Sequence, residues 1–229
     1  GSWDKKINFK DTWKIFYKYN NLKIGFKLSL TGFKHVGIFP EQAENWNFIY
    51  DSVKGFKTSQ PKVLNLFAYT GGASLAAKAA GADVVHVDSV KQVVSWAKEN
   101  MEISGLNDIR WTVEDAAKFV KRELKRGKKY QGIILDPPAY GIGASGERWK
   151  LEEMIDGLLA DIAGILDPKE NFLIINAYSL GFFSLILENL LESHFPKIKN
   201  KETGELYLKA KSGVKLPLGV FGRFNSNSK

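Results

Sequence analysis

The sequence predicts an α/β fold with a doubly wound, mostly parallel β-sheet, and two patterns support this prediction. Beyond residue 60, short apolar runs alternate with longer segments in which apolar residues recur at helical spacing. The apolar runs contain few polar residues, which is typical of strands buried on both faces of a sheet. Because strand–helix–strand crossovers are right-handed, the intervening helices are expected to cover both faces.

Seven strands are expected in this sheet. Five parallel strands separated by helices are expected at 62–69, 83–88, 109–113, 131–136 and 172–178. Two more, 205–211 and 215–224, flank the turn at Ser212-Gly213, and the hairpin that they form adds one antiparallel strand.

Helices are expected between these strands. They cover 73–80, 89–101, 116–124, 151–166 and 182–191. The second begins at Ser89, because Gln92 stands at the capping-box spacing, and Asp115 can cap the third. Pro168 ends the long apolar stripe of the fourth helix.

The N-terminal region is expected to form a small β extension. Apolar and polar residues alternate over 13–39, which indicates a twisted hairpin, and a helix over 45–53 leads into the sheet. We therefore divide the chain into a β extension, residues 1–40, and a main domain, residues 41–229. Gly1-Ser2 is interpreted as a remnant of tag cleavage.

Basic residues are concentrated at both ends of the chain. The net charge at pH 7 is +8, with +6 in residues 1–40, +6 in residues 196–229 and −4 between them. Such ends suit a polyanion such as RNA, and a lysine-rich surface that confers solubility explains them equally well. No apolar stretch approaches the roughly 20 residues that span a bilayer, and no secretory leader is present, so a cytoplasmic location is expected.

The chain contains no cysteine and three histidines, His35, His86 and His194, which lie far apart. The lack of cysteine excludes disulfides, thiolate zinc sites and a cysteine nucleophile. The histidines do not have the spacing of metal ligands, so structural or surface roles are expected and no metal site is predicted.

Ligands of open α/β sheets bind at the carboxyl ends of the strands, and the first strand leads there into a loop with two adjacent glycines. Phe67, Ala68, Tyr69, Thr70, Gly71 and Gly72 form this loop. The glycines let the backbone approach a ligand at a helix N-terminus, and a tight structural turn is the alternative. Without a three-glycine fingerprint or a P-loop lysine, a bound pyrophosphate is disfavoured.

Acidic residues follow the second and third strands. Asp88 lies about 20 residues beyond the glycine loop and can accept both hydroxyls of a ribose, while Ser89 caps the next helix. Asp115 can accept from an exocyclic amine while the Ala116 N–H donates to a ring nitrogen, which is how an adenine edge is recognised. A plain helix cap is the alternative for each aspartate.

The fourth strand ends in Asp136-Pro137-Pro138-Ala139-Tyr140. Prolines have no N–H, and an X-Pro bond keeps the preceding residue extended, so an acid and a fixed carbonyl are presented side by side. These groups can accept hydrogen bonds from a planar amine, and Tyr140 can stack on a planar base. Asp136, Pro137, Pro138 and Tyr140 are therefore our candidate catalytic residues, with a simple Asp-Pro turn as the alternative.

At these residues the chain resembles class I S-adenosylmethionine-dependent methyltransferases, which have a Rossmann-like sheet. More narrowly, it is similar to the 23S ribosomal RNA cytosine-C5 and guanine-N7 methyltransferase group. The resemblance rests on NLFAYTGGAS (65–74), VDSVKQVVSWAKEN (87–100), EDAAKFV (114–120), LDPPAYG (135–141), HVGIFPEQAENW (35–46) and GELYLKAKSGVKLPLGVFGRF (204–224).

The resemblance implies S-adenosyl-L-methionine as cofactor. The loop 67–72 would hold its methionine part, Asp88 and Ser89 its ribose, and Asp115-Ala116 its adenine. Residues 136–140 would line the methyl-transfer site, with Asp136 also near the cofactor, and Pro40-Glu41-Gln42 would close over it.

One departure bears on the substrate. Cytosine-C5 relatives carry a catalytic cysteine after the fifth strand, where this chain has Asn176-Ala177-Tyr178-Ser179. C5 methylation needs a nucleophile to activate the ring, whereas a nitrogen attacks the methyl group directly. We therefore predict transfer to a base nitrogen of ribosomal RNA, with RNA bound by the basic N- and C-terminal segments. Alternatives are a protein side chain or small molecule as substrate, a non-catalytic RNA-binding relative and a nucleotide-dependent oxidoreductase.

Overall fold

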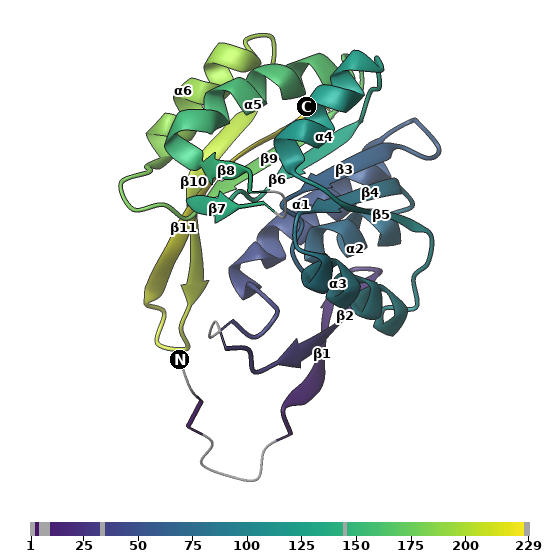
Figure 1. Cartoon of the computed structure of the whole chain (residues 1–229), viewed down its shortest axis with the longest axis vertical. Coiled ribbons are helices and arrows are strands. Elements are labelled where there is room, and N and C mark those ends of the chain that lie inside the picture. Colours follow the sequence, from purple (N-terminus) through teal and green to yellow (C-terminus); the bar gives the residue numbers. More distant parts are fainter. Residues whose placement is uncertain (1–2, 5–9, 33–34, 144–145, 227–229) are drawn as a thin grey trace.

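A seven-stranded sheet with the order β10-β11-β9-β6-β3-β4-β5 forms the centre of the computed structural model, which describes residues 3–4, 10–32, 35–143 and 146–226 (Figure 1). Its strands are β3 (Lys62–Leu66), β4 (Asp83–Asp88), β5 (Ile109–Val113), β6 (Gly132–Leu135), β9 (Phe172–Ala177), β10 (Lys201–Lys209) and β11 (Lys215–Asn225). β11 runs antiparallel to both of its neighbours, and the other pairs are parallel. The predicted sheet with one antiparallel strand is confirmed.

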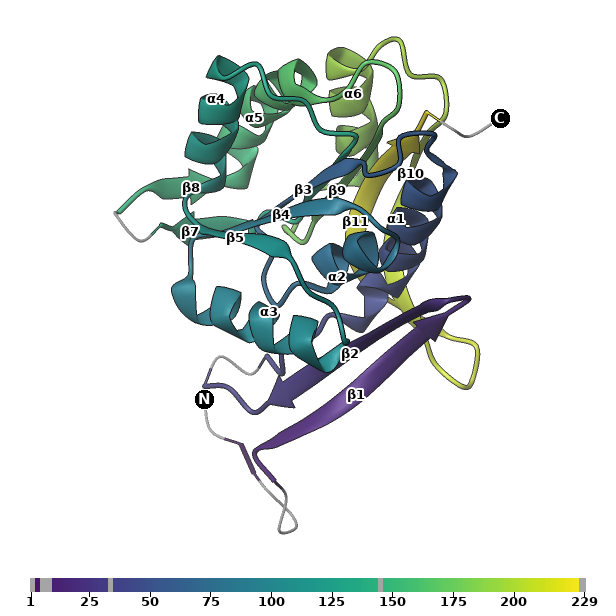
Figure 2. The same cartoon turned by 90° about the vertical axis from the view of Figure 1, so that its right-hand side faces the viewer.

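Helices cover both faces of the sheet (Figure 2). One face carries α1 (Ala43–Gly55), α2 (Gly72–Ala79) and α3 (Lys91–Ile103), and the other carries α4 (Ala116–Lys125), α5 (Leu151–Ile165) and α6 (Ser184–His194). Both faces of the parallel strands are therefore buried, as their uninterrupted apolar runs predict.

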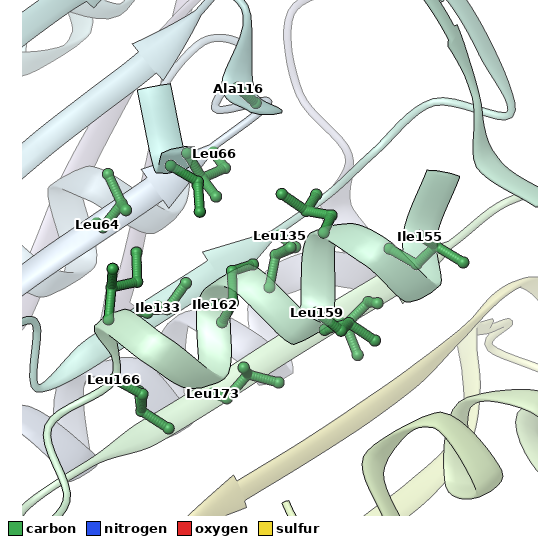
Figure 3. Close-up of a cluster of buried hydrophobic side chains, with 14 of the residues drawn as sticks. Leu64, Leu66, Ala116, Ile133, Leu135, Ile155, Leu159, Ile162, Leu166 and Leu173 are labelled. Atoms are coloured by element: carbon green, nitrogen blue, oxygen red, sulfur yellow. The ribbon is translucent and has the colours of Figure 1, made fainter. Parts of the chain in front are cut away.

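The larger core lies between α5 and the sheet. Figure 3 shows Leu159 and Ile162 of α5 in one cluster with Ile133 and Leu135 of β6, and all four residues are 0% exposed. Burying a side chain of this size contributes about 1.5–3 kcal/mol. This packing holds the end of β6 rigidly, and the acidic turn begins there.

The N-terminal hairpin consists of β1 (Thr12–Tyr19) and β2 (Leu22–Ser29). One side of β2 packs against the helices on the other face of the sheet, α1, α2 and α3. Leu22, Ile24, Phe26 and Leu28 are at most 4% exposed, and the Phe26 ring stacks on Trp46 of α1 at 5.2 Å. The predicted hairpin is confirmed, and the domain boundary at residue 40 stays a prediction. The interpretation of Gly1-Ser2 falls outside the described residues.

Several local features differ from the sequence prediction. β3 ends at Leu66 instead of residue 69, and α3 begins at Lys91 instead of Ser89. A small hairpin, β7 (Tyr140–Ile142) with β8 (Arg148–Lys150), follows the proline pair and was not predicted. A short 3-10 helix, η1 (Pro40–Gln42), precedes α1.

Two features are absent from the described residues. In that part of the chain no helix has the length and apolar character needed to cross a membrane. The same residues contain no group of three or more His, Cys, Asp or Glu side chains arranged to hold a metal ion.

Candidate active site

A cleft of about 1260 Å³ opens at the carboxyl ends of the parallel strands. The predicted residues that line it are Phe67, Tyr69, Asp88, Ser89, Asp115, Ala116, Asp136, Pro137 and Pro138. A smaller cavity of about 50 Å³ is lined by the rest of the glycine loop, Ala68, Thr70, Gly71 and Gly72, and shares Asp136 with the cleft. Tyr140 lines neither cavity, and its side chain is 57% exposed.

The loop between β3 and α2 has an unusual backbone. Phe67 and Tyr69 adopt positive φ of 54° and 48°, and Gly71, the N-cap of α2, has φ 90°. Residues other than glycine rarely occupy this region, and such strain persists only where the surroundings fix it. The Thr70 hydroxyl donates to the Gly37 carbonyl (2.8 Å), and the Asn100 amide donates to the Thr70 carbonyl (3.0 Å). The strand prediction was too long here because this apolar stretch turns away from the sheet.

Asp88 joins this loop to the end of β4. One carboxylate oxygen accepts the Tyr69 backbone N–H and the other accepts the Val90 N–H, both at 2.9 Å. Burial raises the pKa of Asp88, and these two hydrogen bonds oppose the rise. The Val90 contact also explains why Ser89 is not the helix cap, since the Asp88 side chain makes the turn that precedes α3.

Asp115 is the N-cap of α4, as predicted. Its carboxylate accepts the Lys118 backbone N–H at 2.9 Å, and Ala116 is buried behind it. One oxygen of Asp115 is thus committed to the helix. The structure places Asp115 and Ala116 at the cleft, so the cap and the predicted adenine contact are compatible.

Asp136 differs from the other two aspartates of the cleft because one of its carboxylate oxygens has no hydrogen-bond donor. Its Oδ1 atom is buried without a hydrogen-bond partner. Burial, and then the nearby Glu41 carboxylate, raise the pKa of Asp136 to about 7, although Asn176 opposes the shift. A buried acceptor with no donor costs free energy, and a ligand with an N–H group can supply the missing hydrogen bond.

A chain of side-chain amides fixes η1 beside Asp136. The Gln42 amide donates to the Tyr178 hydroxyl (2.7 Å), and the Gln42 carbonyl accepts from Asn45 (2.9 Å) and Asn176 (3.3 Å). Asn45 also donates to the Asn176 carbonyl oxygen at 3.0 Å. This buried network joins η1 to the end of β9, and Gln42 lines the small cavity together with Asp136.

The proline turn is held by the hairpin that follows it. The Trp149 indole N–H donates to the Pro138 carbonyl at 2.7 Å, and the Trp149 ring lies 4.9 Å from the Phe67 ring. The Pro138 carbonyl therefore has a donor within the protein. Trp149 is only 4% exposed and forms part of the cleft wall.

Sequence reasoning missed four aromatic residues of the cleft, Phe39, Trp96, Trp149 and Tyr178. The Phe39 ring lies 5.5 Å from Tyr69 and 6.1 Å from Tyr178. Burial raises the pKa of Tyr178, as do Asp136 and Glu41, so its hydroxyl stays protonated. Phe39 and Tyr178 stand in stretches singled out for other reasons, but Trp149 carries no local signal.

Comparisons with known proteins agree with this geometry. Residues 7–194 match the family described as S-adenosylmethionine-dependent methyltransferase. The ribosomal RNA large subunit methyltransferase K/L of Shewanella frigidimarina is 31% identical over 155 residues, which are 66% of this chain and 21% of that protein. The putative ribosomal RNA large subunit methyltransferase MJ1649 of Methanocaldococcus jannaschii is 34% identical over 139 residues, 60% of this chain and 34% of that protein. The chain thus spans about a fifth to a third of these relatives.

Solved structures show the same fold. A SAM-dependent methyltransferase from Agrobacterium tumefaciens superimposes with a TM-score of 0.87 at 36% identity, covering 96% of this chain and 72% of that chain. SMU.776, a putative methyltransferase complexed with SAH, gives 0.71 at 20% identity, covering 97% and 57%. The family match confirms the predicted resemblance and the class of cofactor. The chain belongs to the S-adenosylmethionine-dependent methyltransferase family.

Proposed function

We propose that this chain transfers a methyl group from S-adenosylmethionine to a nitrogen of a ribosomal RNA base. The observation that carries this proposal is the buried, unpartnered Oδ1 of Asp136 on the cleft, next to loops suited to a nucleoside cofactor. Residues 67–72 hold the methionine part, Asp88 and Ser89 the ribose, and Asp115 with Ala116 the adenine. The cleft volume is larger than the roughly 300–1,000 Å³ of an ordinary ligand pocket, so it has room for a base beside the cofactor.

Asp136 is proposed to bind the target nitrogen. When ionised, its free oxygen accepts an N–H of the base and directs the nitrogen lone pair towards the methyl group. The bound cofactor supplies a methyl carbon on a sulfonium, which is open to in-line displacement. The rigid Asp136-Pro137 turn positions the base, and the carboxylate stabilises the positive charge that develops on the nitrogen.

The preference for nitrogen rests on the residues at the carboxyl end of β9. Asn176 and Tyr178 are committed to the Gln42 network, and the chain offers no cysteine to add to a pyrimidine ring. Tyr140 is proposed to stack on the RNA at the mouth of the cleft, consistent with its exposure.

The names of the relatives support ribosomal RNA as substrate, and the charge distribution supports a polyanion. We propose that the basic segments 1–40 and 196–229 bind the RNA backbone. A neutral protein side chain or small molecule would gain less from this charge distribution than a polyanion does.

Nucleoside mass spectrometry tests the proposal. Ribosomal RNA from a strain lacking the gene is digested and compared with RNA from the same strain expressing the wild-type chain or Asp136→Ala. We expect one N-methylated nucleoside to be absent from the deletion, restored by the wild type and not restored by Asp136→Ala. A missing C5-methylated pyrimidine would refute the nitrogen assignment, and unchanged ribosomal RNA would refute the substrate.

A further inference from the structure

The distal part of the β10–β11 hairpin, residues 207–218, forms an arm that no other strand covers. β9 pairs with β11 only from Val220 onward, so the arm extends beyond the carboxyl end of β9 (Figure 1). This is the same edge of the sheet at which the cleft lies. All twelve residues of the arm are exposed.

The arm has two chemically different faces. Strand register pairs Tyr207 with Pro217 and Lys209 with Lys215, so these four side chains share one face. The Lys215 ammonium lies 4.2 Å from the centre of the Tyr207 ring, which confirms this placement. Leu208 and Leu216 are paired on the other face.

The base of the arm is joined to the active-site network. Arg223 of β11 forms an ion pair with Glu202 of β10 at 2.8 Å, and its guanidinium also donates to Asn45 at 3.3 Å. Asn45 in turn donates to Gln42 and Asn176 beside Asp136. The part of the hairpin from which the arm extends is therefore anchored beside the cleft.

We infer that the Tyr207–Lys209–Lys215 face of the arm binds an unpaired RNA strand next to the target nucleotide. The inference rests on the proposed function and identifies an element of the basic C-terminal segment that contacts the substrate. Tyr207 stacks on a base, and Lys209 and Lys215 contact the phosphates on either side. An aromatic ring flanked by lysines is the pattern by which proteins bind single strands without reading their sequence.

The charge of the arm favours RNA over a second copy of this chain. Lys209, Lys211 and Lys215 are the charged residues of the arm, so it carries three positive charges and no acid. Two copies of this face placed together would bring like charges into contact. A single RNA strand neutralises them.

The experiment is a fluorescence anisotropy titration of the full chain with a fluorescein-labelled 12-nucleotide single-stranded RNA at 50 and 200 mM KCl. We expect Tyr207→Ala to weaken binding about tenfold, within the range measured for loss of one stacked base. Lys209→Gln/Lys215→Gln should lower the salt dependence of log Kd by roughly 0.7 per lost phosphate contact.

Lys121→Gln/Lys125→Gln is the matched control, because both lysines are exposed on α4 and the variant loses the same charge. It should bind RNA nearly as the wild type does. Calorimetry with S-adenosylmethionine and light scattering of each variant should give the wild-type cofactor affinity and oligomeric state.

Three results would overturn the inference. If the wild type binds RNA and the arm variants bind it with the same affinity, the role of the arm is refuted and the proposed function stands. No binding by the wild type would refute both. An arm variant that turns a dimer into a monomer with unchanged RNA affinity would assign the arm to a second copy.

Discussion

Replacing Asp136 by asparagine removes one buried charge without changing the shape of the side chain. The pKa of Asp136 rises from 3.8 to about 7 on folding, because burial and Glu41 disfavour its charged form. The unfolded chain releases this proton near pH 4, whereas the folded chain holds it until pH 7. The folded state therefore loses stability as the pH rises from about 4 to 7, and no further loss follows above pH 7.

The size of the effect follows from the shift. Each pKa unit corresponds to 1.36 kcal/mol, so the charged Asp136 costs the folded state on the order of 4 kcal/mol above pH 7. Asp136→Asn carries no charge at any pH. We expect it to be about as stable as the wild type near pH 4 and more stable by up to about 4 kcal/mol at pH 8.

Urea unfolding of both proteins at pH 4.5, 6, 7 and 8 measures this difference. Asp161→Asn is the control, because this partly exposed aspartate of α5 lies outside the cleft and the variant makes the same side-chain change. The difference in unfolding free energy between this variant and the wild type should not grow from pH 4.5 to 8 as expected for Asp136→Asn. A difference between Asp136→Asn and the wild type that stays constant from pH 4.5 to 8 would refute the reasoning. The rate of methyl transfer by the Asp136→Asn variant should fall about 100-fold or more, because it lacks the carboxylate charge that stabilises the developing positive charge on the target nitrogen.

Three further changes test the cleft. Asp88→Ala should weaken S-adenosylmethionine binding by about 1.5–3 kcal/mol in calorimetry, and unchanged affinity would disprove the ribose assignment. Tyr140→Ala should cost roughly 1–3 kcal/mol in RNA affinity with cofactor affinity unchanged, whereas equal loss of both would make Tyr140 structural. Gly37→Ala should lower the melting temperature, because Gly37 has φ 96° and its added Cβ would collide with the Trp96 ring. If Gly37→Ala melts at the same temperature as the wild type, the backbone around Gly37 can shift to make room for the added Cβ.

Most of the sheet could be predicted because its strands are buried on both sides. Short apolar runs such as 131–136 and 172–178 are typical of strands buried on both faces of a sheet. The ends of these strands then indicate where a ligand lies. Apolar character alone overextended the first strand, because Phe67 and Tyr69 leave the sheet through positive φ. The side chains of Phe67 and Tyr69 do not predict this positive φ, because hydrogen bonds with residues distant in the sequence impose it.

The cleft walls could be predicted only in part. β7 and β8 are three residues each and pair through contacts that the local sequence does not encode, so Trp149 was missed. Gln42 and Tyr178 lie 136 residues apart, and their hydrogen bond depends on the packing of α1 against the end of β9. Local patterns therefore located the acids but not the groups that orient them.

The three aspartates of the cleft differ in how many of their acceptor atoms the protein itself satisfies. Asp88 has a backbone donor on each oxygen, and Asp115 has one on Oδ1. Oδ1 of Asp136 has none and is buried. Asp88 and Asp115 thus already have hydrogen-bond donors from the protein, and we propose that their remaining lone pairs bind the cofactor.

An acid that awaits a donor is destabilised until the substrate supplies one. The N–H of a target amine would relieve the unsatisfied Oδ1 of Asp136 at the moment when the nitrogen begins to carry positive charge. That contact is worth more in the transition state than in the empty cleft, which is the condition for catalysis. This difference in hydrogen bonding is the physical basis for proposing that Asp88 and Asp115 bind the cofactor and that Asp136 contacts the target nitrogen.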